Sequence, residues 1–169
     1  MLKKIKFGTD GWRGIIGQDF NLKNVEAVAQ AIADYLLRVT SHKLPSYAKA
    51  SEGRRVTKVV VGYDTRRLSQ ASARRIASVL AANKIKVILS RQVLPVQAIS
   101  YAVRAYNCSA GIMVTASHNP ADFNGIKIKG SFGGPLESEI TDKIEKLIFQ
   151  RKALKIPLAR AKGILRALR

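Results

Sequence analysis

Short runs of apolar residues alternate along this chain with longer segments in which apolar residues recur every three or four positions. The run from Val59 to Val61 is of the first kind, and the segment from Leu22 to Val39 is of the second. Short apolar runs are typical of buried strands, and the longer spacing is typical of helices that bury one face. Because alternating strands and helices pack as layers, the chain is predicted to form a layered α/β domain.

Residues suited to begin a helix or a strand set the expected boundaries. Asn21 and Ser69 can each cap a following helix, and Pro95 fits the first turn of a third. Residues 125–129 alternate isoleucine with lysine, which predicts a half-exposed strand that pairs with residues 111–115. In chain order, we expect strand 5–7, helix 22–39, strand 59–61, a helix between the cap Ser69 and the stop Asn83, strand 84–89, helix 96–106, strand 111–115, strand 125–129 and helix 136–148, with loops at 8–17 and 41–55.

The length of 169 residues fits one domain with an additional segment. We expect the domain to span residues 1–150 and a basic segment to span 151–169. This basic segment has seven Lys and Arg residues and no acidic residue, and Pro157 is expected to leave only a short helical piece after it.

Charge and composition limit the classes of partner. Thirty Lys and Arg residues against eleven Asp and Glu residues give a formal net charge of +19, which is typical of proteins that meet phosphate, nucleic acid or anionic lipid. The sequence lacks an apolar run long enough for a membrane span, and residues 1–7 do not resemble a secretory signal, so we expect a cytoplasmic protein. The single cysteine, Cys108, excludes an intrachain disulfide and is expected to be a buried core residue.

Two segments that follow or adjoin strands, 7–14 and 115–120, hold most of the unusual polar residues. Loops at the ends of strands are where α/β sheets bind ligands. Ser117 lies just after a predicted strand, and a turn at Asn119 and Pro120 would expose its hydroxyl among backbone amides that suit a phosphate. The same residues also suit a simple turn cap, so both interpretations stay open.

Spacing excludes two other enzyme classes. Ser117 and His118 are adjacent, so their side chains diverge and cannot form the Ser–His pair of a serine hydrolase. The pattern Gly-x-Ser-x-Gly is absent. Gly11, Gly14 and Gly17 do not have the spacing of a dinucleotide-binding loop, and no Gly-Lys-Ser/Thr follows a glycine-rich stretch.

Four motifs occur together in one order. They are Phe-Gly-Thr-Asp-Gly-Trp-Arg-Gly at 7–14, Gly-Tyr-Asp-Thr-Arg at 62–66, Thr-Ala-Ser-His-Asn-Pro at 115–120 and Asn-Gly-Ile-Lys at 124–127. By these motifs the sequence resembles the first domain of the α-D-phosphohexomutases, the phosphoglucomutase and phosphomannomutase family. The resemblance runs from Ile5 to about Phe149 and implies a three-layer α/β/α sandwich with a mixed, mostly parallel sheet. Trp12 resembles the phosphoglucomutase and phosphomannomutase branch more than the phosphoglucosamine branch.

The resemblance implies that Ser117 carries a phosphate, gives it to a hexose 1-phosphate and recovers a phosphate from the other end of the bisphosphate. Such a transfer needs positioning and positive charge more than covalent help. Arg13 and Lys127 match positions that assist proton transfer at the attacking sugar hydroxyl, and His118 matches a position that orients the phosphate.

Five further residues match supporting positions of the site. They are Thr9, Asp10, Asp64, Arg66 and Asn119. For Asp64 and Arg66, two interpretations stay open: an ion pair that braces a loop, and direct contact with the ligand.

The resemblance also implies groups that come from outside this chain. Mg²⁺ would be held by the phosphate on Ser117 and by ligands from further domains, and a hexose 1,6-bisphosphate would be the intermediate and activator. The substrate would be a phosphosugar, and 151–169 would begin a linker to the remaining domains. The chain would then be either an excised first domain or a naturally truncated product, inactive as a mutase by itself.

Two rival functions belong to other classes. The charge of +19 favours a stand-alone domain that binds nucleic acid or another polyanion and keeps the motifs as relics. Aromatic residues at 7% are too few for a base-stacking surface, so no specific nucleic acid is expected. The second rival is a fragment that docks onto a separately encoded remainder of the enzyme.

Overall fold

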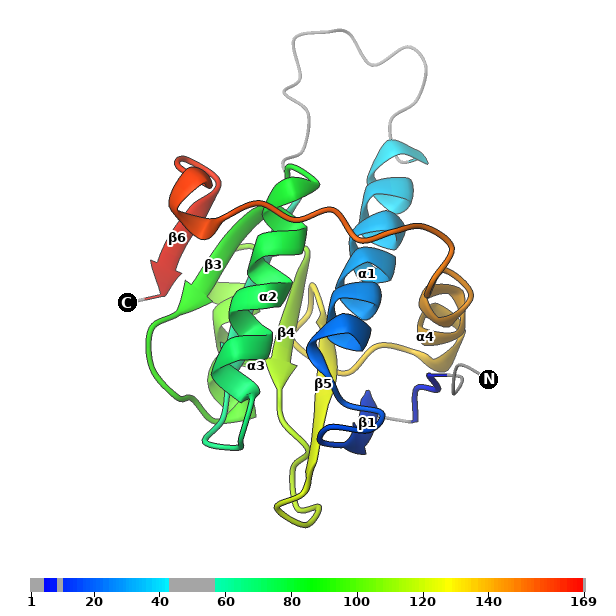
Figure 1. Ribbon diagram of the computed structural model, residues 1–169. Coiled ribbons are helices and arrows are strands. Elements are labelled where there is room, and N and C mark those ends of the chain that lie inside the picture. Colours follow the sequence, from blue (N-terminus) through cyan, green and yellow to red (C-terminus); the bar gives the residue numbers. More distant parts are fainter. Residues whose placement is uncertain (1–4, 9–10, 43–56, 169) are drawn as a thin grey trace, which may run out of the picture.

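The computed structural model describes residues 5–8, 11–42 and 57–168 (Figure 1). Within these ranges it contains a six-stranded sheet and four α-helices. The strands are β1 (Trp12–Ile15), β2 (Lys58–Tyr63), β3 (Lys86–Ser90), β4 (Ala110–Val114), β5 (Phe123–Gly130) and β6 (Leu165–Leu168). The helices are α1 (Leu22–His42), α2 (Ser69–Ala82), α3 (Val96–Ala105) and α4 (Ser138–Glu145), with a short 3-10 helix at Leu158–Arg160.

The sheet is mixed and mostly parallel, as predicted. Its strand order is β1-β5-β4-β2-β3-β6. Neighbours among β4, β2, β3 and β6 are parallel, whereas β5 is antiparallel to both β4 and β1. A parallel pair requires a crossover connection, and α2 and α3 supply such connections after β2 and β3.

Helices cover both faces of the sheet, which confirms the three-layer α/β/α architecture. The larger apolar cluster joins α1, α2 and α4 to one face and includes the fully buried Phe20, Ile76 and Ile112. The smaller cluster joins α3 to the opposite face and includes Ile99 and Met113. Val60, in β2, also packs into the smaller cluster, so the central strand is buried on both faces as its unbroken apolar run predicts.

The first strand lies later than expected. Residues 5–7 are not a strand, and β1 instead forms inside the segment 8–17 that was expected to be a loop. Trp12 pairs with Ile126 of β5, and its ring stacks on Phe20 at a centroid distance of 5.3 Å. The single glycine of β1, Gly14, hides this strand in the sequence because it carries no side chain that would show alternation.

Strand β5 is buried rather than half-exposed. Lys127 and Lys129 are only 8% and 7% exposed. The predicted pairing with residues 111–115 is confirmed within one residue, and the structure shows that the pairing involves residues 110–114 and is antiparallel. Alternation along β5 therefore marks which face of the sheet each side chain meets, with Ile126 and Ile128 in the larger cluster.

One predicted helix cap is confirmed and one is wrong. The side-chain oxygen of Asn21 accepts a hydrogen bond from the backbone N–H of Asn24 at 3.0 Å, as an N-cap does. Ser69 is the first residue of α2, and the cap position belongs to Leu68, which has φ 65° and no side-chain cap bond. The first long helix, α1, extends to residue 42, so residues 41 and 42 are helical and not part of a loop. The rest of that loop, 43–55, lies outside the described residues.

The segment after residue 150 lies across α1 and α2 and returns to the sheet (orange to red in Figure 1). Arg151 forms an ion pair with Asp34 of α1 at 2.7 Å, and Ser78 of α2 donates a hydrogen bond to the Ile156 carbonyl at 2.6 Å. The short helical piece after Pro157 is present as the 3-10 helix, but β6, which pairs with β3, was not predicted. A linker role for 151–169 stays a prediction.

Cys108 is buried, as predicted, and burial raises the pKa of its thiol. Among the described residues, no helix combines the length and the apolar character that crossing a membrane requires.

Candidate functional site

The candidate site lies at one edge of the sheet, where β2 and β4 end and β5 begins. The loop 115–122 joins β4 to β5 and projects from this edge at the bottom of Figure 1. Ser117 and His118 are both exposed on it. The motifs at 62–66 and 115–120 lie at the ends of the parallel strands β2 and β4. The fold therefore brings them to the edge where α/β sheets bind ligands.

Ser117 is held in a tight turn. Its backbone φ is 59°, in the left-handed region that few residues other than glycine adopt. Its N–H donates to the Thr115 hydroxyl at 2.9 Å, and the N–H of Asn119 donates to the Ala116 carbonyl at 3.1 Å. These bonds fix the backbone on both sides of Ser117 and leave its side chain in solvent.

Arg66, in the loop after β2, binds the Ser117 loop through backbone carbonyls. Its guanidinium donates to the carbonyl groups of Ser117 (2.8 Å), Asn119 (2.5 Å), Pro120 (2.7 Å) and Phe123 (3.0 Å). Its Nε lies 3.5 Å from an Asp64 carboxylate oxygen, and the side chains of both residues are mostly buried. Of the two interpretations of this pair, these contacts favour the brace.

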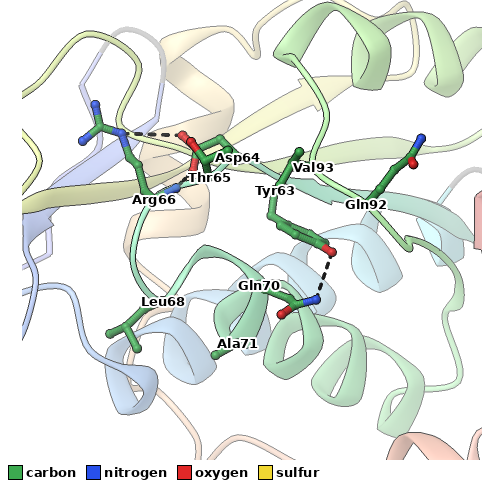
Figure 2. Close-up of a pocket in the computed structure, with 9 residues that line it drawn as sticks. All are labelled: Tyr63, Asp64, Thr65, Arg66, Leu68, Gln70, Ala71, Gln92 and Val93. Atoms are coloured by element: carbon green, nitrogen blue, oxygen red, sulfur yellow. Dashed lines mark hydrogen bonds and ion pairs between the residues drawn. The ribbon is translucent and has the colours of Figure 1, made fainter.

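A shallow pocket of about 540 Å³ lies beside the loop that joins β2 to α2 (Figure 2). Tyr63 and Gln70 line it, and the Gln70 amide donates to the Tyr63 hydroxyl at 3.1 Å. Arg66 also contributes to the lining, but in Figure 2 its guanidinium points away from Tyr63 and Gln70. The residues that line the pocket come from the segment 63–71 and from residues 92 and 93, so the Ser117 loop does not contribute to it.

Arg13 and Lys127 lie on neighbouring strands and face the same side of the sheet. In the register of β1 and β5, Arg13 pairs with Gly125, and Lys127 is two residues further along β5. Residues two apart in a strand point to the same face. Arg13 is exposed, whereas Lys127 lies opposite Met113 of β4 on the face covered by α3. The register thus places the two cations on one face of the sheet, diagonally across β1 and β5, and β5 is the strand that follows the Ser117 loop.

Of the supporting residues Thr9, Asp10 and Asn119, the structure describes only Asn119. Thr9 and Asp10 lie outside the described residues, so their predicted roles stay predictions. Asn119 is half-buried, and its side-chain oxygen is buried with no hydrogen-bond partner in the described part of the chain. Its backbone carbonyl is one of those that Arg66 binds.

The sequence analysis assigned no role in the site to Ser69 or to Asn124, although both are fully buried beside the site. The Ser69 hydroxyl donates to Asp64 at 2.6 Å and accepts from the Asn124 amide at 2.8 Å. Asn124 also donates to the Arg67 carbonyl at 2.9 Å. The only sequence signal was the position of Asn124 in the last motif, because contacts between distant segments leave no periodic pattern.

Because Gly125 has no side chain, the backbones of β1 and of the residue just after β4 can pack closely against β5 there. A Cβ added there would collide with the Trp12 carbonyl oxygen and would lie 2.9 Å from the carbonyl oxygen of Thr115. Both are backbone atoms, so neither can move aside without shifting a strand. Gly125 is therefore required by packing.

We expect Gly125→Ala to lower the free energy of unfolding by about 2–3 kcal/mol, because overpacking forces the backbone to shift. Urea denaturation monitored by circular dichroism measures the change. Gly8→Ala is the matched control, since a Cβ at Gly8 has its nearest neighbour at 3.7 Å, an ordinary contact. Equal stability of the two variants would contradict the packing argument.

The described residues do not form a magnesium site by themselves. No group of three or more His, Cys, Asp or Glu side chains within the described ranges is arranged to hold a metal ion. Asp64, which lies beside the Ser117 loop, is already engaged by Arg66 and Ser69. A phosphate on Ser117 would supply oxygen ligands, but the remaining donors would have to come from elsewhere.

Comparison with known proteins agrees with this geometry. The family model for phosphoglucomutase/phosphomannomutase, alpha/beta/alpha domain I, matches residues 4–155. The chain belongs to this family. A phosphoglucomutase from Staphylococcus epidermidis is 37% identical over 147 residues, which cover 85% of this chain and 24% of that relative. The phosphoglucomutase of Staphylococcus saprophyticus is 36% identical over 162 residues, covering 94% of this chain and 26% of its own length.

Solved structures show the same relationship. A candidate phosphomannomutase from Thermus thermophilus superposes with a TM-score of 0.79 at 34% identity, covering 99% of this chain and 34% of that one. The phosphoglucomutase parafusin from Paramecium, in an open form, superposes with a TM-score of 0.71 at 26% identity, covering 89% of this chain and 26% of that one. This phosphoglucomutase/phosphomannomutase domain therefore spans about a quarter to a third of the length of these relatives.

Proposed function

We propose that this chain is the phosphoserine-bearing domain of an enzyme that interconverts hexose 1-phosphates and hexose 6-phosphates. The observation that carries the proposal is Ser117, exposed on a braced loop at the sheet edge with Arg13 and Lys127 on the adjacent strands. Membership of the family gives this constellation its chemical meaning.

In the proposed reaction, the phosphoryl group moves from Ser117 Oγ to a free hydroxyl of the bound hexose phosphate. The bond between phosphorus and Oγ breaks as the bond to the sugar oxygen forms. Lys127 and Arg13 assist removal of the proton from that hydroxyl, and Ser117 Oγ takes up a proton as its bond to phosphorus breaks, which leaves a free serine hydroxyl. His118, next to the serine, orients the phosphate. The bisphosphate then returns its other phosphate to Ser117, so the enzyme is restored.

Further components complete the proposal. We infer that additional domains of the same protein supply Mg²⁺ ligands and hold the distal phosphate of the substrate, and that a hexose 1,6-bisphosphate serves as intermediate and activator. Mg²⁺ bound there would neutralise phosphate charge. Phosphosugars are cytoplasmic metabolites, so we propose a cytoplasmic enzyme.

The proposal is tested with the protein that includes the further domains. Glucose 1-phosphate or mannose 1-phosphate is supplied with a catalytic amount of the matching 1,6-bisphosphate, and formation of the 6-phosphate is followed. We expect turnover that depends on the bisphosphate. A protein that folds and forms no 6-phosphate from either sugar, or from glucosamine 1-phosphate, would refute the proposal.

The charge of +19 favours polyanion binding as a second candidate function. We expect binding to DNA or RNA to be weak and indifferent to sequence, and to fall by at least about tenfold between 50 mM and 200 mM salt, because phosphate contacts release counterions. Fluorescence titration of two unrelated oligonucleotides at both salt concentrations measures this. Tight binding that survives the higher salt and discriminates between sequences would make nucleic-acid binding the better function.

A further inference from the structure

The guanidinium of Arg66 binds groups of the protein itself. Its Nη1 donates to two backbone carbonyls, its Nη2 donates to two more, and its Nε faces Asp64. A guanidinium has five N–H donors in a rigid fork, and here both ends of the fork and its base are occupied. The side chain is 14% exposed, so it has little surface left for a ligand.

A second layer of contacts holds Arg66 in place. Asp64 accepts hydrogen bonds from the Arg66 backbone N–H at 3.0 Å and from the Ser69 hydroxyl at 2.6 Å. The amide of Asn124 donates to the same hydroxyl. These contacts run without a break from the end of β2, through the start of α2, to the start of β5. A polar network in which each member is satisfied is rigid, which suits it to hold a loop.

The network joins two parts of the candidate site. At one end, Arg66 fixes the carbonyls of Ser117, Asn119 and Pro120 in the loop and that of Phe123 at the start of β5. At the other end, Asn124 lies three residues before Lys127 on β5. One set of side chains therefore fixes the loop that bears the nucleophile relative to the strand that bears a cation.

We propose that Arg66 is a positioning residue, which holds the Ser117 loop by its backbone carbonyls with support from Asp64, Ser69 and Asn124, and which does not bind the phosphate. The catalytic part of this inference rests on the proposed function. Arginine near a phosphate is commonly a ligand of that phosphate, so the inference assigns Arg66 the opposite role.

Substitution of Arg66 by lysine distinguishes the positioning role from the phosphate-binding role. An ammonium group can replace a guanidinium as a point charge beside a phosphate, but it cannot span four carbonyls and a carboxylate. If Arg66 positions the loop, Arg66→Lys should fail nearly as badly as Arg66→Gln. If Arg66 binds phosphate, Arg66→Lys should recover much of the function.

Amide hydrogen exchange on this chain tests the brace without any assay of activity. In Arg66→Gln and Arg66→Lys, we expect the amides of residues 116–123 to exchange at least about tenfold faster, because the loop opens more readily. Arg67→Gln is the matched control: it removes the same charge one residue away, from an exposed side chain. Unchanged exchange in both Arg66 variants, or equal acceleration in Arg67→Gln, would overturn the brace. Should Arg66→Gln fail to fold, the same measurement on Arg66→Lys and Asn124→Asp decides the result. Faster exchange of residues 116–123 in these variants would support the brace, and unchanged exchange would overturn it.

Kinetics on the protein with its further domains test the positioning role. We expect kcat to fall about 100-fold in both Arg66 variants while KM for the hexose phosphate changes less than about threefold, as misplacement of a reacting group predicts. A raised KM that Arg66→Lys restores would show phosphate binding and overturn the inference. A loosened loop with normal kcat would also overturn it.

The two proposals fail in different ways. Absence of mutase activity in the unmodified protein would refute the proposed function and the catalytic part of this inference together, while hydrogen exchange would still decide whether Arg66 braces the loop. Normal mutase activity with unchanged exchange in the Arg66 variants would refute the inference alone.

Discussion

Replacing Ser117 with alanine is expected to abolish mutase turnover in the protein that includes the further domains, with a loss of at least about 10⁴-fold. The substitution removes the oxygen that carries the phosphate. The adjacent His118 cannot take its place, because its side chain starts from the next residue of the turn and so points in a different direction. Since the covalent route is lost entirely, a basic environment around the loop cannot compensate.

Intact-mass measurement and peptide mapping test the assignment independently of turnover. We expect one phosphate per chain in the protein without substitutions, located on Ser117, and none in Ser117→Ala. Ser109→Ala is the matched control, because Ser109 is an exposed serine at the opposite end of β4. Phosphate found on another serine, or a normal rate in Ser117→Ala, would contradict the assignment.

Local patterns in the sequence predict those helices and strands that form regardless of which elements they pack against. The helix that begins after Asn21 has its own cap and an apolar face, and the triple valine of β2 is buried whichever strands flank it. The position of Ser117 followed from the same logic, because the strand before it and the turn after it are both local features. These parts of the fold and site agree with the structure.

Elements that depend on distant partners were missed or misplaced. Residues 12–15 form a strand only because β5 pairs with them, and residues 165–168 form one only because β3 does. Neither segment alternates clearly in the sequence. Similarly, the burial of Lys127 follows from the position of α3 across the sheet, which no pattern within β5 can indicate.

The brace at Arg66 could be predicted only as an open choice for the same reason. Its partners are backbone carbonyls more than fifty positions away in the chain, and any residue type presents the same carbonyl. The motifs identify which residues matter, but the contact that gives Arg66 its role has no sequence signature. Ser69 and Asn124 were likewise indistinguishable from a helix cap and a strand residue until the fold placed them against Asp64.

The chain of residues 1–169, assayed without the further domains, is expected to show mutase turnover at least about 10³–10⁴-fold below that of the protein that includes them. Ser117 and His118 are exposed at the sheet edge, so water surrounds the proposed phosphate. The described residues also lack a three-donor metal group to neutralise phosphate charge. Charge compensation at a transferring phosphoryl group is worth several kcal/mol of barrier, and each 1.36 kcal/mol is a factor of about ten in rate.

The purified chain and the longer protein are compared at equal concentration with glucose 1-phosphate, glucose 1,6-bisphosphate and Mg²⁺. Circular dichroism and hydrogen exchange of residues 116–123 first establish that the chain alone keeps its fold and its braced loop, so that a low rate reflects the incomplete site. Adding the separately produced further domains should restore part of the rate, because the missing groups then close over Ser117. A near-normal rate from the chain alone would show that residues 1–169 already hold a complete site, and would place charge compensation in the cations near the loop, of which Arg13 and Lys127 are the first to test by substitution.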